Sequence, residues 1–422
     1  MPRAKGLPLV GALPQILLRP LDFLEETVAR RGSVFEIDLG VTRAVVVADV
    51  DAVEHVLLTH TGNYGKGGEI WEGIREVLGR GLGSSEGELW RRQRKLMQPK
   101  FQRSFLEGVR DTIAETIEDE LDGLRSDEPI DLARWTDGLL ATLAVRVLFG
   151  SDLDPAKVDE VRTTMAAVSD SVIQGLVTRK LPRWLPLTGR ERLSRARRIF
   201  DHNVAELIAE RRRHPRPSKD LLGLLLGATD EQGSMSDEQL RDEAITFYIA
   251  GYETTGTALA WTLWLLAGHP HVRDALLAEL DGGSTEAPLL HACMQEGLRL
   301  YPPALFVIRH TVGDDVLLGH PVRAGTPVLV SPWLVHHNPA IWPDPKRFDP
   351  ERFLSPAPER SRLAWIPFGA GQRICIGKAL AMLELEEGLR RVLRDFTPTL
   401  SDGCPAPRPR LSTALRSSTG IF

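Results

Sequence analysis

The chain has little cysteine, and its cysteines do not form a recognisable metal or disulfide pattern. The 422 residues include three cysteines, at positions 293, 375 and 404, which are far apart and lack CxxC spacing. An odd, scattered set of this kind indicates neither a zinc site nor a disulfide framework. It fits a reducing compartment, and we therefore expect a cytoplasmic protein.

The chain also lacks an excess of positive charge. It carries 52 Lys and Arg against 57 Asp and Glu, for a net charge of −5 and a pI of about 6.2. Overall electrostatic attraction to nucleic acid is therefore excluded as a basis for function. With 42% hydrophobic and 26% charged residues, the composition is that of a globular protein with ample material for a core.

Long uninterrupted apolar runs are absent from the N-terminal region. Residues 7–18 are apolar but are broken by Pro8, Gly11 and Pro14, and no signal-peptide cleavage pattern follows them. Such a stretch is too short and too interrupted to span a bilayer. We therefore expect a protein without a membrane anchor.

One of the cysteines lies in an unusual setting. Cys375 lies in a glycine-rich stretch, residues 368–377, and a helix-forming run follows at 378–384. Unpaired backbone N–H groups and the helix dipole favour a thiolate at such a place, and Gly371 and Gly377 would let a flat ligand approach closely. A lone cysteine is more often a small buried apolar residue. The combination of a thiolate with a flat ligand nevertheless points to haem iron.

A longer pattern around this cysteine is far more specific. Phe-x-x-Gly-x-Arg-x-Cys-x-Gly, running from Phe368 to Gly377, matches the haem-binding signature of the cytochrome P-450 family at every fixed position. The chain therefore resembles a haem-thiolate monooxygenase. The resemblance implies that Cys375 is the axial ligand of the iron in haem b and that Arg373 pairs with a haem propionate. It also places Phe368, Gly371 and Gly377 at the cofactor.

A long helix is predicted in the middle of the chain. A capping box begins at Ser236, and the helical pattern continues to a Gly-His-Pro stop that ends at Pro270. Between Glu243 and His269 the only charged residue is Glu253. A transmembrane helix would have this apolar character, but so would the buried helix of a large soluble protein, which we predict because no second comparable segment exists.

Polar residues interrupt this apolar helix, although burying them is costly unless they are partnered or used. Residues 250–255 match the family pattern (Ala/Gly)-Gly-x-(Asp/Glu)-Thr-(Thr/Ser). The resemblance implies that Gly251 leaves room for dioxygen and that Glu253 and Thr254 deliver protons, a role for which a positioned acid and hydroxyl are suited. The alternative for Thr254 is a hydroxyl bonded back to its own helix.

Further residues match the family's cofactor ligands and scaffold. Trp90 and Arg94, at i and i+4 on one helical face, match a Trp-x-x-x-Arg pattern that reaches the propionates, and Arg309 matches another propionate ligand. Glu296 and Arg299 match the family's Glu-x-x-Arg helix. The resemblance adds the Arg of Pro-x-Arg-Phe as a third, structural partner. This partner is Arg352.

A local basic patch accompanies the Trp90 helix on an otherwise acidic protein. It consists of Arg91, Arg92, Lys95, Lys100 and Arg103. The patch is either a solvated helix face or a docking surface for an acidic electron carrier. The sequence contains neither a dinucleotide-binding fingerprint after a strand nor a cysteine cluster, so we expect a separate ferredoxin or flavodoxin-type donor with its reductase.

The substrate pocket is expected from three regions. Residues 61–88 are rich in glycine and large apolar side chains, which suits a loop over a cavity or, equally, an irregular surface loop. In the family this region lines the pocket, and the proline-broken stretch at 178–190 joins two lid helices. The predicted pocket residues are Trp71, Ile74, Ala250, Ala304, Leu305, Phe306, Thr413 and Ala414.

These inferences combine into one expectation. The fold is mainly α with a small β-lobe, in a single cytochrome P-450 domain over residues 1–422. Its β-rich elements lie near 35–50, 304–335 and 405–422, and haem lies between the central helix and the cysteine loop. The expected activity uses dioxygen to hydroxylate an apolar small molecule: a terpenoid, fatty-acid-like compound or polyketide. We expect a monomer.

Two other functions remain open at this point. The first is a peroxide-dependent haem-thiolate peroxygenase or isomerase, which would be expected to lack the acid–alcohol pair of Glu253 and Thr254. The second is a non-catalytic helical binding protein in which Cys375 is inert. Carbon monoxide added to the reduced protein separates the second from an enzyme, because only thiolate-ligated haem gives a strongly red-shifted Soret band.

Overall fold

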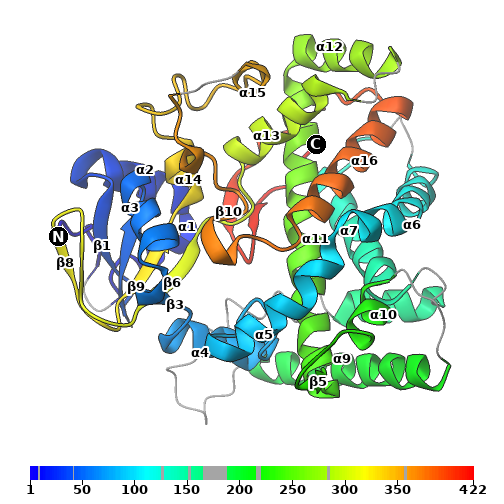
Figure 1. Ribbon diagram of the computed structural model, residues 1–422. Coiled ribbons are helices and arrows are strands. Elements are labelled where there is room, and N and C mark those ends of the chain that lie inside the picture. Colours follow the sequence, from blue (N-terminus) through cyan, green and yellow to red (C-terminus); the bar gives the residue numbers. More distant parts are fainter. Residues whose placement is uncertain are drawn as a thin grey trace.

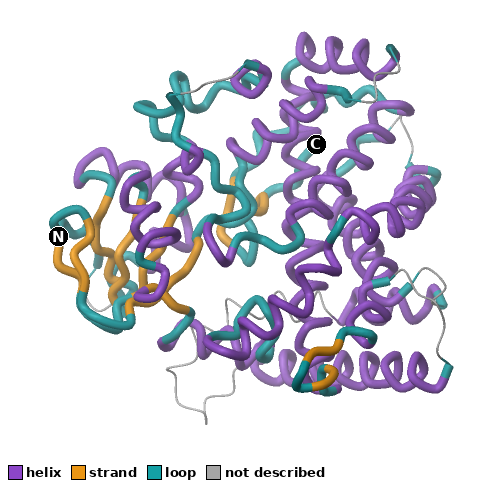
Figure 2. Tube along the Cα trace, viewed as in Figure 1, coloured by secondary structure: helices purple, strands orange, loops and turns teal. Residues whose placement is uncertain are grey.

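The computed structural model describes most of the chain as a helical part beside a β-rich lobe (Figure 1, Figure 2). The predicted lid stretch lies outside the described residues from 178 to 187. The described residues are 1–7, 10–40, 42–124, 128–150, 154–164, 188–214, 220–282, 286–355 and 359–422.

A five-stranded sheet forms the centre of the β-rich lobe. Its order is β1-β2-β9-β6-β3, with β2 and β9 parallel and the other pairs antiparallel. The N-terminal hairpin thus pairs with strands that come more than 250 residues later. The strands are β1 (Val34–Asp38), β2 (Arg43–Val47), β3 (Tyr64–Gly65), β6 (Val307–Thr311) and β9 (Pro327–Val330).

Alternating side chains cover both faces of this sheet, as the pleat of a strand requires. On β2, Val45 and Val47 belong to one buried cluster, which includes Val53 from α3 (Val50–Glu54). Val46 belongs to a second cluster with Leu24 from α2 (Pro20–Arg31). The N-terminal elements therefore hold the sheet on both sides.

Shorter elements occur in both parts of the molecule (Figure 1). The hairpins are β4 (Thr229–Asp230) with β5 (Gly233–Ser234), β7 (Asp315–Leu317) with β8 (His320–Val322), and β10 (Pro409–Leu411) with β11 (Leu415–Ser417). The short helical elements are α1 (Leu13–Leu18), η1 (His55–Thr59), η2 (Thr61–Asn63), η3 (Gln98–Phe101), α14 (Pro332–His336), α15 (Glu351–Leu354), η4 (Arg362–Ala364) and η5 (Gly371–Arg373).

The helical part surrounds the long helix α11 (Asp237–Gly268) (Figure 1). Residues 155–164 are helical as well. The other helices are α4 (Gly68–Leu78), α5 (Gly87–Met97), α6 (Arg103–Leu121), α7 (Leu132–Phe149), α9 (Thr188–Arg213), α10 (Leu221–Leu226), α12 (Pro270–Asp281), α13 (Pro288–Leu300) and α16 (Lys378–Asp395).

The ends of α11 confirm the predicted boundaries. The Ser236 hydroxyl accepts a hydrogen bond from the Gln239 N–H at 3.2 Å, and Pro270 begins the next helix. Most of the 32 residues of α11 are buried. Gly256 lets α7 pass closely, because a Cβ there would lie 3.2 Å from the Thr136 carbonyl oxygen. In the described part of the chain, no helix has both the length and the apolar character needed to cross a bilayer.

The predicted loop over residues 61–88 is wrong in part, because Gly68–Leu78 forms α4. Three of the glycines that suggested a loop lie at the ends of this helix. Gly67 is its N-cap, and Gly79, with φ of 73°, is its C-cap. Glycine at these positions terminates a helix rather than preventing one. The predicted strand from Ala304 likewise begins only at Val307.

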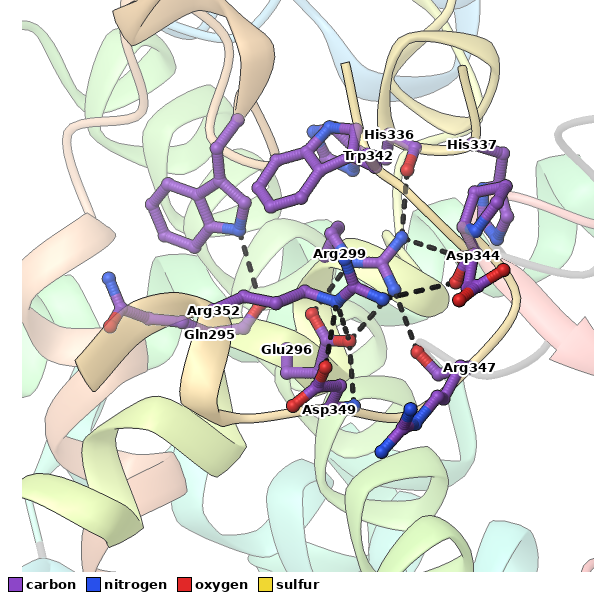
Figure 3. A network of polar contacts seen from close by, with 12 residues as sticks. Gln295, Glu296, Arg299, His336, His337, Trp342, Asp344, Arg347, Asp349 and Arg352 are labelled. Atoms are coloured by element: carbon purple, nitrogen blue, oxygen red, sulfur yellow. Dashed lines mark hydrogen bonds and ion pairs between the residues drawn. The ribbon is translucent and has the colours of Figure 1, made fainter. Parts of the chain in front are cut away.

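A buried network of charges ties α13 to the segment that leads into the cysteine loop (Figure 3). Arg299 donates to both carboxylate oxygens of Glu296, at 2.6 and 2.8 Å, and both side chains are fully buried. Arg352 lies 3.5 Å from the same carboxylate. Arg299 also donates to the carbonyl oxygens of His336 and Pro345, at 2.8 and 2.7 Å. The three predicted scaffold residues therefore meet.

Two adjacent histidines, His336 and His337, lie beside this network. Burial, with the nearby positive groups, lowers the pKa of His336 well below its usual range, so its ring is neutral. The His336 Nε2 accepts from the Ile366 N–H at 2.8 Å. His337 stacks on Trp333 with ring centroids 3.8 Å apart. These contacts connect the network to the start of the cysteine loop.

The buried network makes a prediction about stability. Glu296→Gln should lower the free energy of unfolding by about 3–5 kcal/mol, because two guanidinium groups would be left buried without their carboxylate. Urea unfolding followed by circular dichroism measures this change. The control is Glu26→Gln, which breaks an exposed pair with Arg19 and should change stability by no more than about 0.5 kcal/mol. Equal effects of the two variants would contradict the prediction.

Candidate active site

A cavity of about 440 Å³ lies between α11 and the cysteine loop. Its walls come from α4, α5, α7, α11 and α16, from the segment around β6, and from the cysteine loop. Most of the predicted site residues therefore meet in one place. Those that line the cavity are Trp71, Trp90, Arg94, Ala250, Gly251, Thr254, Ala304, Phe306, Arg309, Phe368, Arg373, Cys375 and Gly377.

The cysteine loop presents its sulfur to this cavity. The Cys375 N–H donates to the Phe368 carbonyl oxygen at 3.0 Å, which closes the loop. The backbone N–H groups of Gly377 and Lys378, at the start of α16, are directed at the sulfur. Cys375 is exposed to the cavity while the surrounding protein shields it from bulk water. Sequence and backbone geometry thus agree on a sulfur at a helix N-terminus.

Burial nevertheless decides the protonation of this thiol. It raises the pKa of Cys375 above its ordinary value, whereas the two backbone N–H groups and the charge of Arg94 lower it by less. The expectation that the helix N-terminus favours the thiolate is confirmed in its direction, but burial raises the pKa of Cys375 by more than these groups lower it. A bound metal cation deprotonates a coordinating thiol outright, so the loop fits a metal ligand better than a free thiolate.

Four cationic side chains gather at one edge of the cavity. Arg373 donates to the Ser85 carbonyl oxygen at 3.1 Å, pairs with Glu86 at 2.5 Å and lies 4.1 Å above the Trp90 ring. Arg94 donates to the Ile374 carbonyl oxygen at 3.0 Å. The other two cations are Arg309 and Lys66.

Burial and mutual repulsion act on these cations. Arg309 is buried, and burial and the charge of Arg373 lower its pKa to about 10. Burial, followed by the charges of Arg373 and Arg309, lowers the pKa of Lys66 well below its usual range. Glu86 is the acid that offsets them among the described residues. This unbalanced positive charge fits a ligand that carries carboxylates.

Lys66 was not predicted as a site residue. It stands between glycines in a segment without helical or strand periodicity, so its neighbours in the sequence give no indication of a role. Only the fold brings it to Arg309, which lies on β6, and to Arg373, which lies in the cysteine loop. One feature of the sequence could have suggested a role for Lys66: it is a single long cationic residue among small residues near a predicted pocket.

The central helix supplies the opposite wall of the cavity. A Cβ at Gly251 would meet nothing within 4 Å, so this position borders open space. The Thr254 hydroxyl lines the cavity and donates to the Ala250 carbonyl oxygen at 2.6 Å. The back-bonded alternative thus holds for the hydroxyl proton, while the oxygen remains able to accept a hydrogen bond.

The predicted acid does not share this wall. Glu253 is 1% exposed and does not line the cavity. Its carboxylate accepts a hydrogen bond from the Thr413 hydroxyl and lies 3.7 Å from Arg416, on the far side of α11. Successive helical residues point about 100° apart, which explains the separation from Thr254. The acid and the alcohol are therefore neighbours in sequence but face different surroundings.

Some predicted residues lie elsewhere. Ile74, Leu305, Thr413 and Ala414 are not among the residues that line the cavity. Leu305 packs in the buried cluster behind the sheet. Gly371, with φ of 73°, is required for a different reason from the predicted one, because a Cβ there would lie 2.0 Å from the Leu57 carbonyl oxygen. The glycine makes room for the protein backbone rather than for a ligand.

The predicted basic patch is partly neutralised by ion pairs. Arg92 donates to Asp230 at 2.9 and 3.1 Å, and Arg103 pairs with Glu107 at 2.7 Å. Arg91 pairs with Glu88. Because Arg92 joins α5 to β4, it has a structural partner and is not a free surface charge.

Comparison with known proteins decides the family. The family model described as cytochrome P-450 matches residues 1–421. The chain belongs to the cytochrome P-450 family. A cyclooctat-9-en-7-ol 5-monooxygenase from Streptomyces melanosporofaciens is 36% identical to this P-450 over 393 residues, or 90% of this chain and 85% of the relative. Pentalenene oxygenase from Streptomyces avermitilis is 31% identical over 421 residues, or 94% and 90%.

A solved structure confirms the fold of this P-450. The retinoic-acid-bound cyanobacterial CYP120A1 matches with a TM-score of 0.82 and 25% identity, covering 95% of this chain and 93% of the other. The predicted fold, mainly α with a small β-lobe, is therefore confirmed. Family membership and the named oxygenases among its relatives identify this P-450 as a monooxygenase, in preference to the non-catalytic binding protein.

The cofactor of this family is haem iron, and the residues present fit it. Cys375 lines the cavity, and its sulfur would hold the iron. Phe368 and Gly251 provide apolar walls on either side of the space, and the cation cluster lies at one edge, where the two carboxylates of a porphyrin would be neutralised.

The cation cluster generates a prediction. Lys66→Met should accelerate loss of haem about tenfold, because a buried charge-assisted hydrogen bond contributes on the order of 1.5 kcal/mol. Transfer of haem to excess apomyoglobin measures this rate. Lys95→Met, which removes an exposed lysine from α5, is the matched control and should leave the rate unchanged. Identical rates for both variants would show that Lys66 does not contact the cofactor.

Proposed function

We propose that this P-450 holds haem b through Cys375 and uses dioxygen to hydroxylate a terpenoid, with electrons from a separate ferredoxin or flavodoxin-type donor and its reductase. The observation that carries the proposal is the placement of the Cys375 sulfur. It faces an apolar cavity whose opposite wall carries Gly251 and Thr254. We further propose that the chain is a single domain, monomeric and cytoplasmic.

The protein's own residues would hold and orient the reactants. Cys375 binds the iron, and Lys66, Arg94, Arg309 and Arg373 neutralise the propionates. Bound haem would supply the activation of dioxygen, and electron donation from the cysteine sulfur favours O–O cleavage.

The opposite wall of the cavity, formed by α11, would then accommodate dioxygen and supply its protons. Gly251 leaves space beside the helix, where a Cβ would meet nothing within 4 Å. The Thr254 oxygen can accept a hydrogen bond from a group in the cavity, since its own proton is donated to Ala250. We assign the supply of protons to Glu253, which is the nearby buried acid on α11.

The cavity walls and the relatives together favour a terpenoid over the fatty-acid-like and polyketide alternatives. The remaining walls are largely apolar and include Phe101, Ala144, Leu148 and Phe247. Such walls select for hydrophobic surface rather than for a charged group. Two relatives carry the names of a cyclooctat-9-en-7-ol monooxygenase and a pentalenene oxygenase.

The electron donor would dock by charge complementarity on the basic patch. Lys95 and Arg91 are exposed on α5, and Arg103 is exposed at the start of α6. An acidic carrier would find these charges together on an otherwise acidic protein. The pairing of Arg92 with Asp230 leaves it out of this surface.

Substitution of the proposed ligand tests the function directly. Cys375→Ser should abolish the strongly red-shifted Soret band of the reduced carbon monoxide complex, because an alcohol does not replace the thiolate as electron donor. The absorption difference spectrum measures this. Cys404→Ser, at an exposed cysteine, should retain the band. An unchanged band in Cys375→Ser would remove the ligand assignment, and with it the proposed function.

A binding screen tests the substrate class. Terpenoid hydrocarbons and alcohols should shift the haem toward high spin, and fatty acids and polyketides should do so more weakly. Phe306→Ala should weaken terpenoid binding about tenfold, because it removes a large apolar contact from the cavity wall. The control is Leu354→Ala, which alters an exposed leucine on α15. A spin shift with fatty acids alone would rule out the terpenoid assignment.

A further inference from the structure

A chain of polar contacts leads away from Glu253 on the side opposite the cavity. The Thr413 hydroxyl, in the turn between β10 and β11, donates to one carboxylate oxygen of Glu253. The guanidinium of Arg416, on β11, lies 3.7 Å from the other oxygen. Arg416 also forms an ion pair with Asp137 on α7. The C-terminal hairpin thus connects an acid of the central helix to an acid of its neighbour.

This chain of contacts crosses from the interior to the surface. Glu253 is 1% exposed, whereas the side chains of Arg416 and Asp137 are 22% and 23% exposed. Water therefore reaches these contacts at Arg416 and Asp137, whereas Glu253 lies inside the protein. Burying a carboxylate costs free energy of folding. The presence of Glu253 beside a partly solvated ion pair therefore indicates a function for it.

The hairpin is held firmly where these contacts are made. The Trp261 indole N–H donates to the Leu415 carbonyl oxygen at 3.0 Å, and the Leu415 N–H donates to the Pro303 carbonyl oxygen at 2.8 Å. Gly256 brings α7, and with it Asp137, close to α11. Thr413 and Arg416 are therefore fixed relative to Glu253 by backbone contacts independent of the charges.

We propose that Thr413 and Arg416 are positioning residues that hold the Glu253 carboxylate at the inner end of the proton supply, with Asp137 at its entrance from solvent. The inference rests on the proposed function, because protons are consumed only if the protein reduces dioxygen. Each hydroxylation takes one dioxygen, two electrons from the donor protein and two protons, and gives the hydroxylated product and one water.

Glu253 would act in two positions, one against the C-terminal hairpin and one turned toward Thr254. Against the hairpin, its carboxylate can take up a proton from water beside Arg416 and Asp137. A change of rotamer of the Glu253 side chain then brings its carboxyl group toward Thr254, whose oxygen borders the cavity. Arg416 is already paired with Asp137, which weakens its attraction for Glu253. The pair therefore orients the Glu253 carboxylate without holding it permanently as the anion.

The test uses the holoenzyme with its electron donor. Arg416→Gln should lower donor-driven product formation about tenfold, which is less than the roughly 10²–10⁴-fold contribution of a proton-transfer group because Arg416 only positions that group, and should raise the solvent deuterium isotope effect. Reaction with hydrogen peroxide should change less than about twofold, because peroxide brings both protons with it. Arg416→Lys should restore much of the loss, and Thr413→Val and Asp137→Asn should show the same pattern more weakly.

The controls separate positioning from a purely structural role. Arg408→Gln makes the same charge change at an exposed residue of the C-terminal segment and should behave as the wild type. Glu253→Gln combined with Arg416→Gln should be no slower than Glu253→Gln alone, because Arg416 acts through Glu253. If Arg416→Gln does not fold, Thr413→Val and Asp137→Asn decide the question by the same measurements.

Two results would overturn the proposal. The first is an Arg416→Gln enzyme that matches the wild type in donor-driven rate and isotope effect. The second is an equal fall of the donor-driven and peroxide-driven rates with an unchanged isotope effect, which would make the ion pair a structural contact only. Failure of the proposed function is distinguishable, because it appears as loss of the red-shifted carbon monoxide band in the unaltered protein.

Discussion

The sulfur of Cys375 lies at the N-terminus of a helix and is shielded from bulk water. The rest of the site depends on these two opposing effects on its pKa. Backbone N–H groups at the start of α16 favour the anion, and burial disfavours it more strongly. A bound cation would favour the anion of a thiol in this setting. The surrounding chain keeps the loop in place, closed by the hydrogen bond from the Cys375 N–H to the Phe368 carbonyl oxygen.

Buried charge recurs at three places around that loop, each with a different outcome. The Glu296 carboxylate is fully paired with guanidinium groups, which fixes the segment leading to the loop. The cations at the cavity edge are under-compensated and fit an anionic ligand. Glu253 is paired across α11 with the C-terminal hairpin. Fully paired charges thus build the scaffold, and under-compensated positive charges line one edge of the cavity.

Local patterns could be predicted because neighbouring residues decide them. The capping box at Ser236, the N-terminal hairpin and the loop around Cys375 all depend on contacts within a few residues. The glycines around α4 misled because composition counted over a window does not distinguish helix ends from a loop. The role of Gly371 was assigned to a ligand, whereas a distant carbonyl of Leu57 requires it.

The sequence by itself determined the family, the long buried helix and the Glu–Arg–Arg scaffold, because each is a fixed spacing of particular residue types. Only the tertiary structure decided that Lys66 joins the cation cluster and that Glu253 turns away from Thr254 toward Arg416. The physical reason is that these partners are separated by more than 160 residues. Their meeting follows from how helices and strands pack, which no local spacing records.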